Sequence, residues 1–357
     1  MSAGPPRRLD GERGWHIARY ADAAVLLKSD AVAMIEIARR LEKLSARMGG
    51  DGFANLILLL GSSHPFQNPP AHDATRAVLR ETMAELARRW TAETVAALVR
   101  DLLKPHSGGE PFDAVKGLAQ PLPSRVVAGT LGLEADRVLE CGALAREVSA
   151  IWHRDVLPLR VLAAMEEQAS RIVALLQASG KRRDEFARLA FLTMAGVDTT
   201  AGLLGNAIAI LAGDPALQQR LRDDPARIPG FVNETLRVRP PLRRLVGRRT
   251  CAPVRLSDCE IPEGALIEID LDSVHRDPDA YPDPDRFDIA RGGPPTLAFG
   301  FGAHTCVGAP LARLEARILI EQLLTACTVR PAGAAVRGGT ADWNEFHSLP
   351  IRLERRV

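Results

Sequence analysis

The segment 184–213 constrains the fold more than any other stretch of this 357-residue chain. It reads DEFARLAFLTMAGVDTTAGLLGNAIAILAG, and apolar residues fall on most faces of a helix built from it. A helix that is apolar all round is stable in a soluble protein only when other elements bury it. We therefore expect one long central helix with other helices packed around it.

The rest of the sequence divides into a helical part and a part made of strands and loops. Five segments have apolar residues at every third or fourth position, which indicates amphipathic helices: 16–30, 31–48, 74–90, 137–152 and 162–179. After residue 240 proline, glycine and aspartate become frequent, and short runs such as ALIEIDL (265–271) are typical of strands. We expect a mainly α protein with small β-sheets (α+β), folded as one domain over 1–357, with a flexible stretch over about 1–14.

Charge and hydropathy exclude several classes of function. The chain has 46 basic and 44 acidic residues, so its net charge of +2 provides no strong attraction for nucleic acid or an anionic membrane. No run of the sequence approaches the roughly 18–20 uninterrupted apolar residues of a membrane span. The N-terminal letters MSAGPPRRLDGERGW lack the apolar core of a secretory signal. We expect a soluble, cytoplasmic protein that binds neither nucleic acid nor a membrane.

The cysteines are few, odd in number and without CxxC pairs, which argues against a disulfide framework and a structural zinc site. They are Cys141, Cys251, Cys259, Cys306 and Cys327. Cys306 is the most informative, because it lies in FGFGAHTCVG (299–308), just before a predicted helix. Backbone N–H groups and the positive end of a helix dipole favour the thiolate there, and glycines let the backbone approach a flat, bulky partner.

Other interpretations of this loop can be tested on its letters. A dinucleotide-binding GxGxxG would need glycine where the chain has Thr305. A zinc site would need a second ligand pair at finger spacing, and none follows Cys306 and His304. A nucleophilic cysteine with a remote histidine remains open.

The pattern FGxGxHxCxG resembles the haem-ligand loop of the cytochrome P450 family, and the chain matches it at every specified position. The resemblance implies the P450 fold, with the long helix over haem b and Cys306 as the axial thiolate ligand of the iron. It also places Phe299, Gly300 and Gly308 at the haem, and His304 at a haem propionate.

The letters AGVDTT (195–200) inside the long helix resemble the oxygen-binding groove of that family. By this resemblance Asp198 and Thr199 are catalytic and help to deliver protons to bound dioxygen, while Ala195 and Gly196 leave room for it. The same letters would also fit a helix whose threonine hydroxyls bond back to carbonyls one turn earlier.

Substrate-facing positions follow from the same resemblance. They are Met194, Leu242 and Val246, with the loop 58–67 above the haem and a lid that includes 151–160. Each of these positions fits core packing equally well. Compared with a typical bacterial member, the N-terminus and the lid look abbreviated, which indicates an open pocket or a large substrate, such as one presented by a carrier protein.

Glu234 and Arg237 form an ExxR pair on a predicted helix. Such a pair alone is usually exposed and contributes about 0.3–0.5 kcal/mol. In the family it is a buried ion pair beneath the haem, joined by an arginine from a downstream loop. Here that arginine would be Arg286 in YPDPDRF, where Asp285 replaces the commoner glutamate. We assign the pair and Arg286 to the positioning of the Cys306 loop.

His72 and Arg76 lie four residues apart and share one helix face. A solvated face would carry the same residue types. The family binds the anionic haem propionates with an HxxxR at this place, and the fork of an arginine suits a carboxylate. Arg248 is the expected further propionate partner, with Arg244 and Arg249 as alternatives.

The resemblance implies a haem-thiolate monooxygenase that uses dioxygen to hydroxylate, epoxidise or oxidatively couple a small organic or carrier-bound substrate in bacterial secondary metabolism. A peroxide-driven enzyme ranks lower because Asp198 and Thr199 are intact, and a non-catalytic haem-bearing recruitment module is a third candidate. The sequence shows no flavin, nicotinamide or iron–sulfur segment, so electrons would come from a separate ferredoxin and its reductase. Arg80, Arg313 and Arg317 would form a basic docking face on a monomer.

Overall fold

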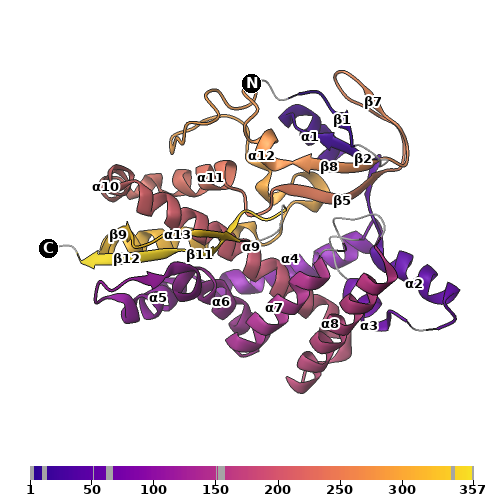
Figure 1. Cartoon of the computed structure of the whole chain (residues 1–357), viewed down its shortest axis with the longest axis horizontal. Helices are drawn as coiled ribbons and strands as arrows, with labels where there is room; N and C mark the ends of the chain where they lie inside the picture. Colours follow the sequence, from indigo (N-terminus) through magenta and orange to yellow (C-terminus); the bar gives the residue numbers. More distant parts are fainter. Residues whose placement is uncertain are drawn as a thin grey trace.

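The computed structural model describes residues 4–9, 14–50, 52–61, 67–149, 151, 157–338 and 342–355. Helices form most of the molecule, with one sheet at the upper right of Figure 1 and another at its left. This confirms the mainly α, α+β prediction. The helices are α1 Tyr20–Lys28, α2 Ile37–Arg47, α3 Ala54–Gly61, α4 Ala71–Arg89, α5 Ala92–Leu103, α6 Pro121–Leu131, α7 Ala135–Ser149, α8 Leu159–Ala178, α9 Phe186–Gly213, α10 Pro215–Asp223, α11 Ile228–Val238, α12 Leu271–Val274 and α13 Ala309–Ala326. The strands are β1 Arg7–Arg8, β2 Gly14–Ile17, β3 Val32–Met34, β4 Phe112–Asp113, β5 Arg244–Thr250, β6 Val254–Arg255, β7 Glu260–Ile261, β8 Leu266–Asp270, β9 Cys327–Pro331, β10 Val336–Gly338, β11 Glu345–Ser348 and β12 Pro350–Arg355.

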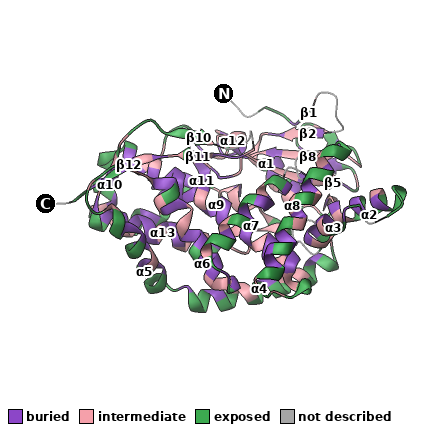
Figure 2. Cartoon of the chain, turned by 60° about the horizontal axis from the view of Figure 1, so that its bottom comes forward, coloured by how far each residue is buried: buried purple, intermediate pink, exposed green. Residues whose placement is uncertain are grey.

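Helix α9 is the predicted long helix, and it lies in the middle of the molecule (Figure 1). Its C-terminal half shares a core cluster with α5, α6, α11 and α13 through residues such as Leu203. Its N-terminal half shares another with α3, α7 and α8 through residues such as Leu189. The segment Arg183–Gly213 is long and apolar enough to span a membrane, but 72% of its most apolar window is buried inside the protein. The outer helices differ from α9, because each buries one side and exposes the other (Figure 2).

The largest sheet has the strand order β1-β2-β8-β5-β3, in which β2 and β8 run parallel. The last two residues of β2 overlap the segment 16–30, and β3 lies inside 31–48; the apolar spacing predicts helix over the whole of both segments. That prediction is wrong at the start of each segment, because these residues pair with β8 and β5, more than 200 residues away. Local periodicity does not report such distant pairing.

The structure describes only part of the predicted lid, of the predicted loop 58–67 and of the N-terminal stretch. Residues 62–66 and 152–156 lie outside the described residues, so the predicted lid over 151–160 is represented by Ile151 and by residues 157–160. The first half of the predicted loop 58–67 is not a loop, because it belongs to α3. Within 1–14, β1 pairs with β2, so this part of the predicted flexible stretch is a strand.

Candidate functional site

The loop that precedes α13 is held in shape by its own backbone. The Cys306 N–H donates to the Phe299 carbonyl at 2.8 Å. Gly300 and Gly302 have φ values of 70° and 74°, in the left-handed region that favours glycine. A side chain at Gly302 would also collide with the carbonyl oxygen of Leu27, at the end of α1. The loop therefore requires these glycines for its turns and for its close approach to α1.

The Cys306 side chain is exposed, yet enough protein surrounds its sulfur for desolvation to raise the pKa of the thiol. Four groups oppose this effect and lower the pKa of Cys306. They are the backbone N–H groups of Gly308 and Ala309, which hydrogen-bond the sulfur, and the guanidinium groups of Arg313 and Arg76. Hydrogen-bond donors and cations of this kind stabilise a thiolate and a thiolate–metal bond.

The other cysteines lie in different surroundings. Burial raises the pKa of Cys141 and of Cys327 to about 11, which keeps both as thiols. Desolvation and the carboxylates of Asp22 and Asp258 raise the pKa of Cys259, and the exposed Cys251 donates to the carbonyl of Asp30. Among the described residues no group of three or more histidine, cysteine, aspartate or glutamate side chains could hold a metal ion. A metal at Cys306 would therefore need ligands that the described protein does not supply, as a porphyrin does.

Helix α4 brings His72 and Arg76 against this loop. His72 is 1% exposed, and its ring centroid lies 4.3 Å from that of His304. Arg76 donates to the carbonyl of Thr305 at 3.0 Å, although 229 residues separate the two in sequence. Desolvation and the neighbouring Arg80 lower the pKa of Arg76, while Cys306 raises it. The HxxxR pair and the cysteine loop thus form one site.

The three arginines that the sequence leaves as alternatives all lie on β5, but their partners differ. Arg244 is paired with two carboxylates, at 3.2 and 3.5 Å, and Arg249 donates to a backbone carbonyl at 2.8 Å. Arg248 donates to the carbonyl of Val246 at 3.0 Å and has no carboxylate partner among the described residues. Desolvation lowers the pKa of Arg248 to about 10. A desolvated guanidinium without a carboxylate is suited to bind an anion.

On α9, Ala195 and Thr199 share one face. The Thr199 hydroxyl donates to the Ala195 carbonyl at 2.6 Å, which leaves its oxygen lone pairs for another donor. A Cβ at Gly196 would lie 2.9 Å from Cγ2 of Val127 on α6, so this glycine allows α6 to pack closely against α9.

Asp198 is 7% exposed and forms a forked ion pair with Arg146 of α7, at 2.6 Å to Nη2 and 3.2 Å to Nε. The same guanidinium contacts Glu345 at 2.5 Å and lies over the ring of Trp343 at 5.0 Å. Desolvation raises the pKa of Asp198 although Arg146 acts in the opposite direction. Sequence reasoning missed Arg146 and Glu345, because nothing in their local patterns distinguishes them from surface charges.

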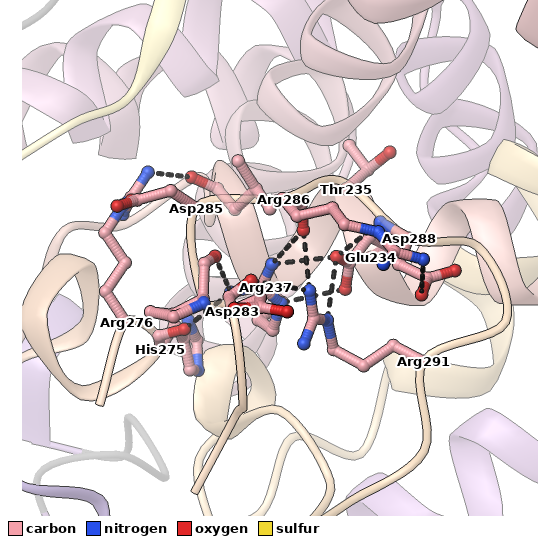
Figure 3. A network of polar contacts seen from close by, with 12 residues as sticks. Glu234, Thr235, Arg237, His275, Arg276, Asp283, Asp285, Arg286, Asp288 and Arg291 are labelled. Atoms are coloured by element: carbon pink, nitrogen blue, oxygen red, sulfur yellow. Dashed lines mark hydrogen bonds and ion pairs between the residues drawn. The ribbon is translucent and has the colours of Figure 1, made fainter. Parts of the chain in front are cut away.

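Figure 3 shows a second polar network, centred on Glu234 and Arg237 of α11. Two parallel hydrogen bonds of 2.7 and 2.8 Å join the two side chains, which are at most 3% exposed. Arg237 also donates to the carbonyls of His275 and Pro284, at 2.7 Å each. The backbone N–H of Asp288 donates to Glu234 at 2.9 Å. Although burial acts against it, this set of donors lowers the pKa of Glu234.

The third arginine of the network is Arg291, so the prediction of Arg286 is wrong. Arg291 Nε lies 3.0 Å from Glu234 Oε1, and its side chain is 11% exposed. The Arg286 side chain is 67% exposed and pairs with Asp288 at 2.9 Å. Asp283 has a φ of 49°, and the N–H of Arg286 donates to its carbonyl in a turn. This turn directs the carbonyl of Arg286, and not its side chain, towards Arg291.

Buried His275 connects this network to the Cys306 loop. Its carbonyl accepts from Arg237, and its Nε2 accepts from the backbone N–H of Leu297 at 2.9 Å. Leu297 in turn accepts from the N–H of Gly300, within the loop. Burial lowers the pKa of His275 to about 3, so the ring is neutral. The network therefore holds the start of the loop through one neutral histidine.

Glu315 of α13 is a further buried group that sequence reasoning missed. It is 2% exposed, and its Oε2 has no hydrogen-bond partner among the described residues. Burial raises the pKa of Glu315 to about 8, so the carboxyl carries a proton at neutral pH. A charged residue facing inward on a predicted amphipathic helix is the signal that would have identified it.

The predicted substrate positions have mixed surroundings. Met194 is buried in the cluster of α3, α7, α8 and α9. Leu242 forms an isolated bridge with Trp343, beside the contacts of Arg146. Val246 is half-buried on β5 and accepts from Arg248. Met194 thus lies in a packed core, Leu242 lies beside the Trp343 ring that Arg146 covers, and Val246 lies beside Arg248.

Comparisons with known proteins decide the family. The cytochrome P450 family model matches residues 172–337. Cytochrome P450 107B1 of Saccharopolyspora erythraea is 32% identical over 339 residues, which cover 89% of this chain and 83% of the relative. This chain belongs to the cytochrome P450 family. It is a P450 monooxygenase, an oxidoreductase, and its cofactor is haem b.

Further P450 relatives and structures agree. Erythromycin C-12 hydroxylase of S. erythraea is 32% identical, with coverage of 87% of this chain and 81% of the relative. Monooxygenase PikC of Streptomyces venezuelae is 35% identical, with coverage of 81% and 75%. The structure of CalO2 superposes with a TM-score of 0.83 at 26% identity and covers 98% of this chain and 93% of CalO2.

The residues around Cys306 fit haem b. An exposed sulfur with thiolate-stabilising donors suits an axial ligand. Arg76 and Arg248 are desolvated guanidinium groups, and His72 lies beside His304, which together suit two carboxylates. The sulfur thus suits an iron that has one protein ligand, and the cationic side chains suit the two propionate carboxylates of haem b.

Proposed function

We propose that this P450 uses dioxygen to hydroxylate, epoxidise or oxidatively couple a small organic or carrier-bound substrate in bacterial secondary metabolism. The observation that carries the proposal is the pair Asp198 and Thr199. A buried carboxyl with a raised pKa and an oriented hydroxyl lie next to each other on the central helix. Such a pair suits proton delivery inside a site that excludes water.

Cys306 would be the axial ligand of the iron, and His72, Arg76, Arg248 and His304 would bind the propionates. Phe299, Gly300 and Gly308 would shape the protein surface on the cysteine side. Arg313 lies over the Phe299 ring at 4.4 Å, which fixes that ring beside the cysteine loop. When bound, haem b supplies dioxygen activation and oxygen transfer, with the thiolate as electron donor.

Thr199 would act as an acceptor and relay. Its hydroxyl hydrogen is engaged by the Ala195 carbonyl, so its oxygen accepts a hydrogen bond from a group in the groove. Asp198 would carry the proton. A rotation of its side chain away from Arg146 would bring that proton to the groove, while Glu345 continues to pair with Arg146.

The relatives guide the choice of substrate class. They include a hydroxylase of erythromycin and a cyclomarin C epoxidase from Salinispora arenicola, the latter 31% identical to this chain. The fold also matches P450BioI, whose structure contains an acyl carrier protein ligated to hexadec-9Z-enoic acid, with a TM-score of 0.80. These cases support a bulky or carrier-bound substrate for this chain.

We further propose that the chain is one cytoplasmic, monomeric domain that takes electrons from a ferredoxin and its reductase. Among the proposed docking residues, Arg317 is paired with Glu321 and Arg313 contacts Phe299, so only their remaining donors could face an acidic partner. Arg80 is exposed on α4.

The test compares dioxygen and peroxide as oxidants. A substrate is first selected by the low-spin to high-spin shift that it causes. The wild type should form product with dioxygen and ferredoxin, and Thr199→Ala should lower product at least about tenfold and release peroxide instead. Thr325→Ala is the matched control, because the exposed Thr325 near the end of α13 also donates to a carbonyl one turn earlier. Equal product from the Thr199 variant, or better turnover with peroxide, would refute the proposal.

A further inference from the structure

A cavity of about 740 Å³ lies where the C-terminal end of α11, helix α12 and the β10–β11 hairpin meet. These elements lie side by side in Figure 2. Its lining includes the side chains of Arg239, Arg243, Arg276 and Arg337. None of the residues assigned above to haem or to dioxygen lines it. The cavity is therefore separate from the site at Cys306.

The charges around this cavity are unbalanced. Asp272 is the one acidic residue in its lining, against four arginines. Arg243 already pairs with Asp272 at 3.0 Å. Arg276 donates to two backbone carbonyls and has a longer contact, of 3.5 Å, with Asp285, whose side chain is 89% exposed. The carboxylates at the cavity thus compensate Arg243 and, weakly, Arg276.

Among the residues that the structure describes, neither Arg239 nor Arg337 has a carboxylate partner. Arg337 donates to the amide oxygen of Asn344 at 2.8 Å and lies over the ring of Phe346 at 4.7 Å. No hydrogen bond or ion pair joins the Arg239 guanidinium to any described residue. Desolvation lowers the pKa of Arg239, and the nearby charges of Arg337 and Arg276 lower it further. A partly buried cation whose charged neighbours are other cations is unfavourable unless an anion joins them.

We propose that this cavity binds a phosphate-bearing small molecule, with Arg239 as its central contact. Guanidinium forks match phosphate oxygens, and several arginines together favour a group with more than one negative charge. The volume lies within the range of small-molecule pockets and exceeds what a single inorganic phosphate fills. The ligand is therefore a phosphorylated compound larger than orthophosphate, held between α11 and the β10–β11 hairpin.

The experiment measures binding of pyrophosphate to the haem-loaded enzyme by calorimetry at low salt. The wild type should show one saturable site whose affinity falls as chloride is added. Arg239→Met should weaken binding at least about tenfold, as expected for the loss of a charge-assisted contact. Arg39→Met is the matched control, since Arg39 is an exposed arginine of α2 paired with Glu36, and it should bind as the wild type does.

A second measurement separates binding from a structural role. Because Arg239 is desolvated and repelled by its neighbours, Arg239→Met without ligand should be as stable as the wild type or more stable, and pyrophosphate should no longer raise its Tm. The reduced carbon monoxide spectrum should be unchanged. The proposal is overturned if pyrophosphate does not saturate, if Arg39→Met weakens binding equally, or if Arg239→Met is destabilised and still binds.

Discussion

Two polar networks of this protein are built in opposite ways. Around Glu234 and Arg237, guanidinium and carboxylate atoms meet several donors and carbonyls, and His275 ties them to the Cys306 loop. Around Asp198, one arginine is shared between two carboxylates that belong to α9 and β11. The first arrangement suits a fixed support, and the second suits a group that changes partners.

The largest expected effect comes from breaking the fixed network. Glu234→Gln leaves Arg237 buried without its counter-charge, which should cost about 3–5 kcal/mol of unfolding free energy and lower haem retention. Denaturant unfolding and haem content measure this. Glu321→Gln removes a partly exposed partner of Arg317 and should cost less than about 1 kcal/mol. Similar losses in the two variants would show that the Glu234 network is not a support.

Replacing the two arginines of the downstream loop sharpens the same point. Arg291→Ala should lower stability by about 2–4 kcal/mol, because it removes a buried partner of Glu234. Arg286→Ala should cost less than about 1 kcal/mol, because only an exposed pair is lost. The two variants are compared by urea unfolding under identical conditions. A larger loss for Arg286→Ala would restore the prediction from sequence.

A change in the network around Asp198 should affect turnover and not the free energy of unfolding. Asp198→Asn should lower product formation about 10- to 100-fold, because the amide cannot supply the proton. The carbon monoxide spectrum and the haem content should stay as in the wild type. Asp184→Asn, which alters an exposed partner of Arg182, should leave turnover unchanged. Full activity of the Asp198 variant would remove the contrast between the two networks.

The last expected effect concerns Glu315 and the pH dependence of stability. Burial raises the pKa of its carboxyl to about 8, against about 4.3 in an unfolded chain. The stabilising contribution is complete below pH 4.3 and is lost as pH rises towards 8, since the unfolded chain releases the proton first. Glu315→Gln should therefore lose less stability between pH 5 and pH 8 than the wild type does. The unfolding free energies of both proteins are measured in urea across this pH range. An equal change with pH in the wild type and in Glu315→Gln would contradict a buried, protonated carboxyl.

The sequence predicts best what is local. The letters around Cys306 and Thr199, and the four-residue spacing of His72 and Arg76, are compact patterns, and the structure brings the cysteine loop and α4 into contact. The long apolar segment likewise predicts α9, because burial on every face leaves few alternatives.

What the sequence could not predict depends on distant or irregular backbone. Arg146 meets Asp198 across 52 residues, through the packing of α7 on α9. Arg291 replaces Arg286 because one left-handed residue, Asp283, redirects the loop. Strands β2 and β3 form only because β8 and β5 pair with them. Each outcome depends on the tertiary fold and not on a neighbouring letter.

The central claim, that Cys306 is the thiolate ligand of the haem iron, is tested by one spectrum. The purified protein is reduced, carbon monoxide is added, and the Soret band is recorded for the wild type, Cys306→Ala and Cys251→Ala. Cys251 is another exposed cysteine and serves as the control. We predict the red-shifted band of a thiolate-ligated haem in the wild type and in Cys251→Ala, and its loss in Cys306→Ala. A red-shifted band that persists in Cys306→Ala would contradict the account.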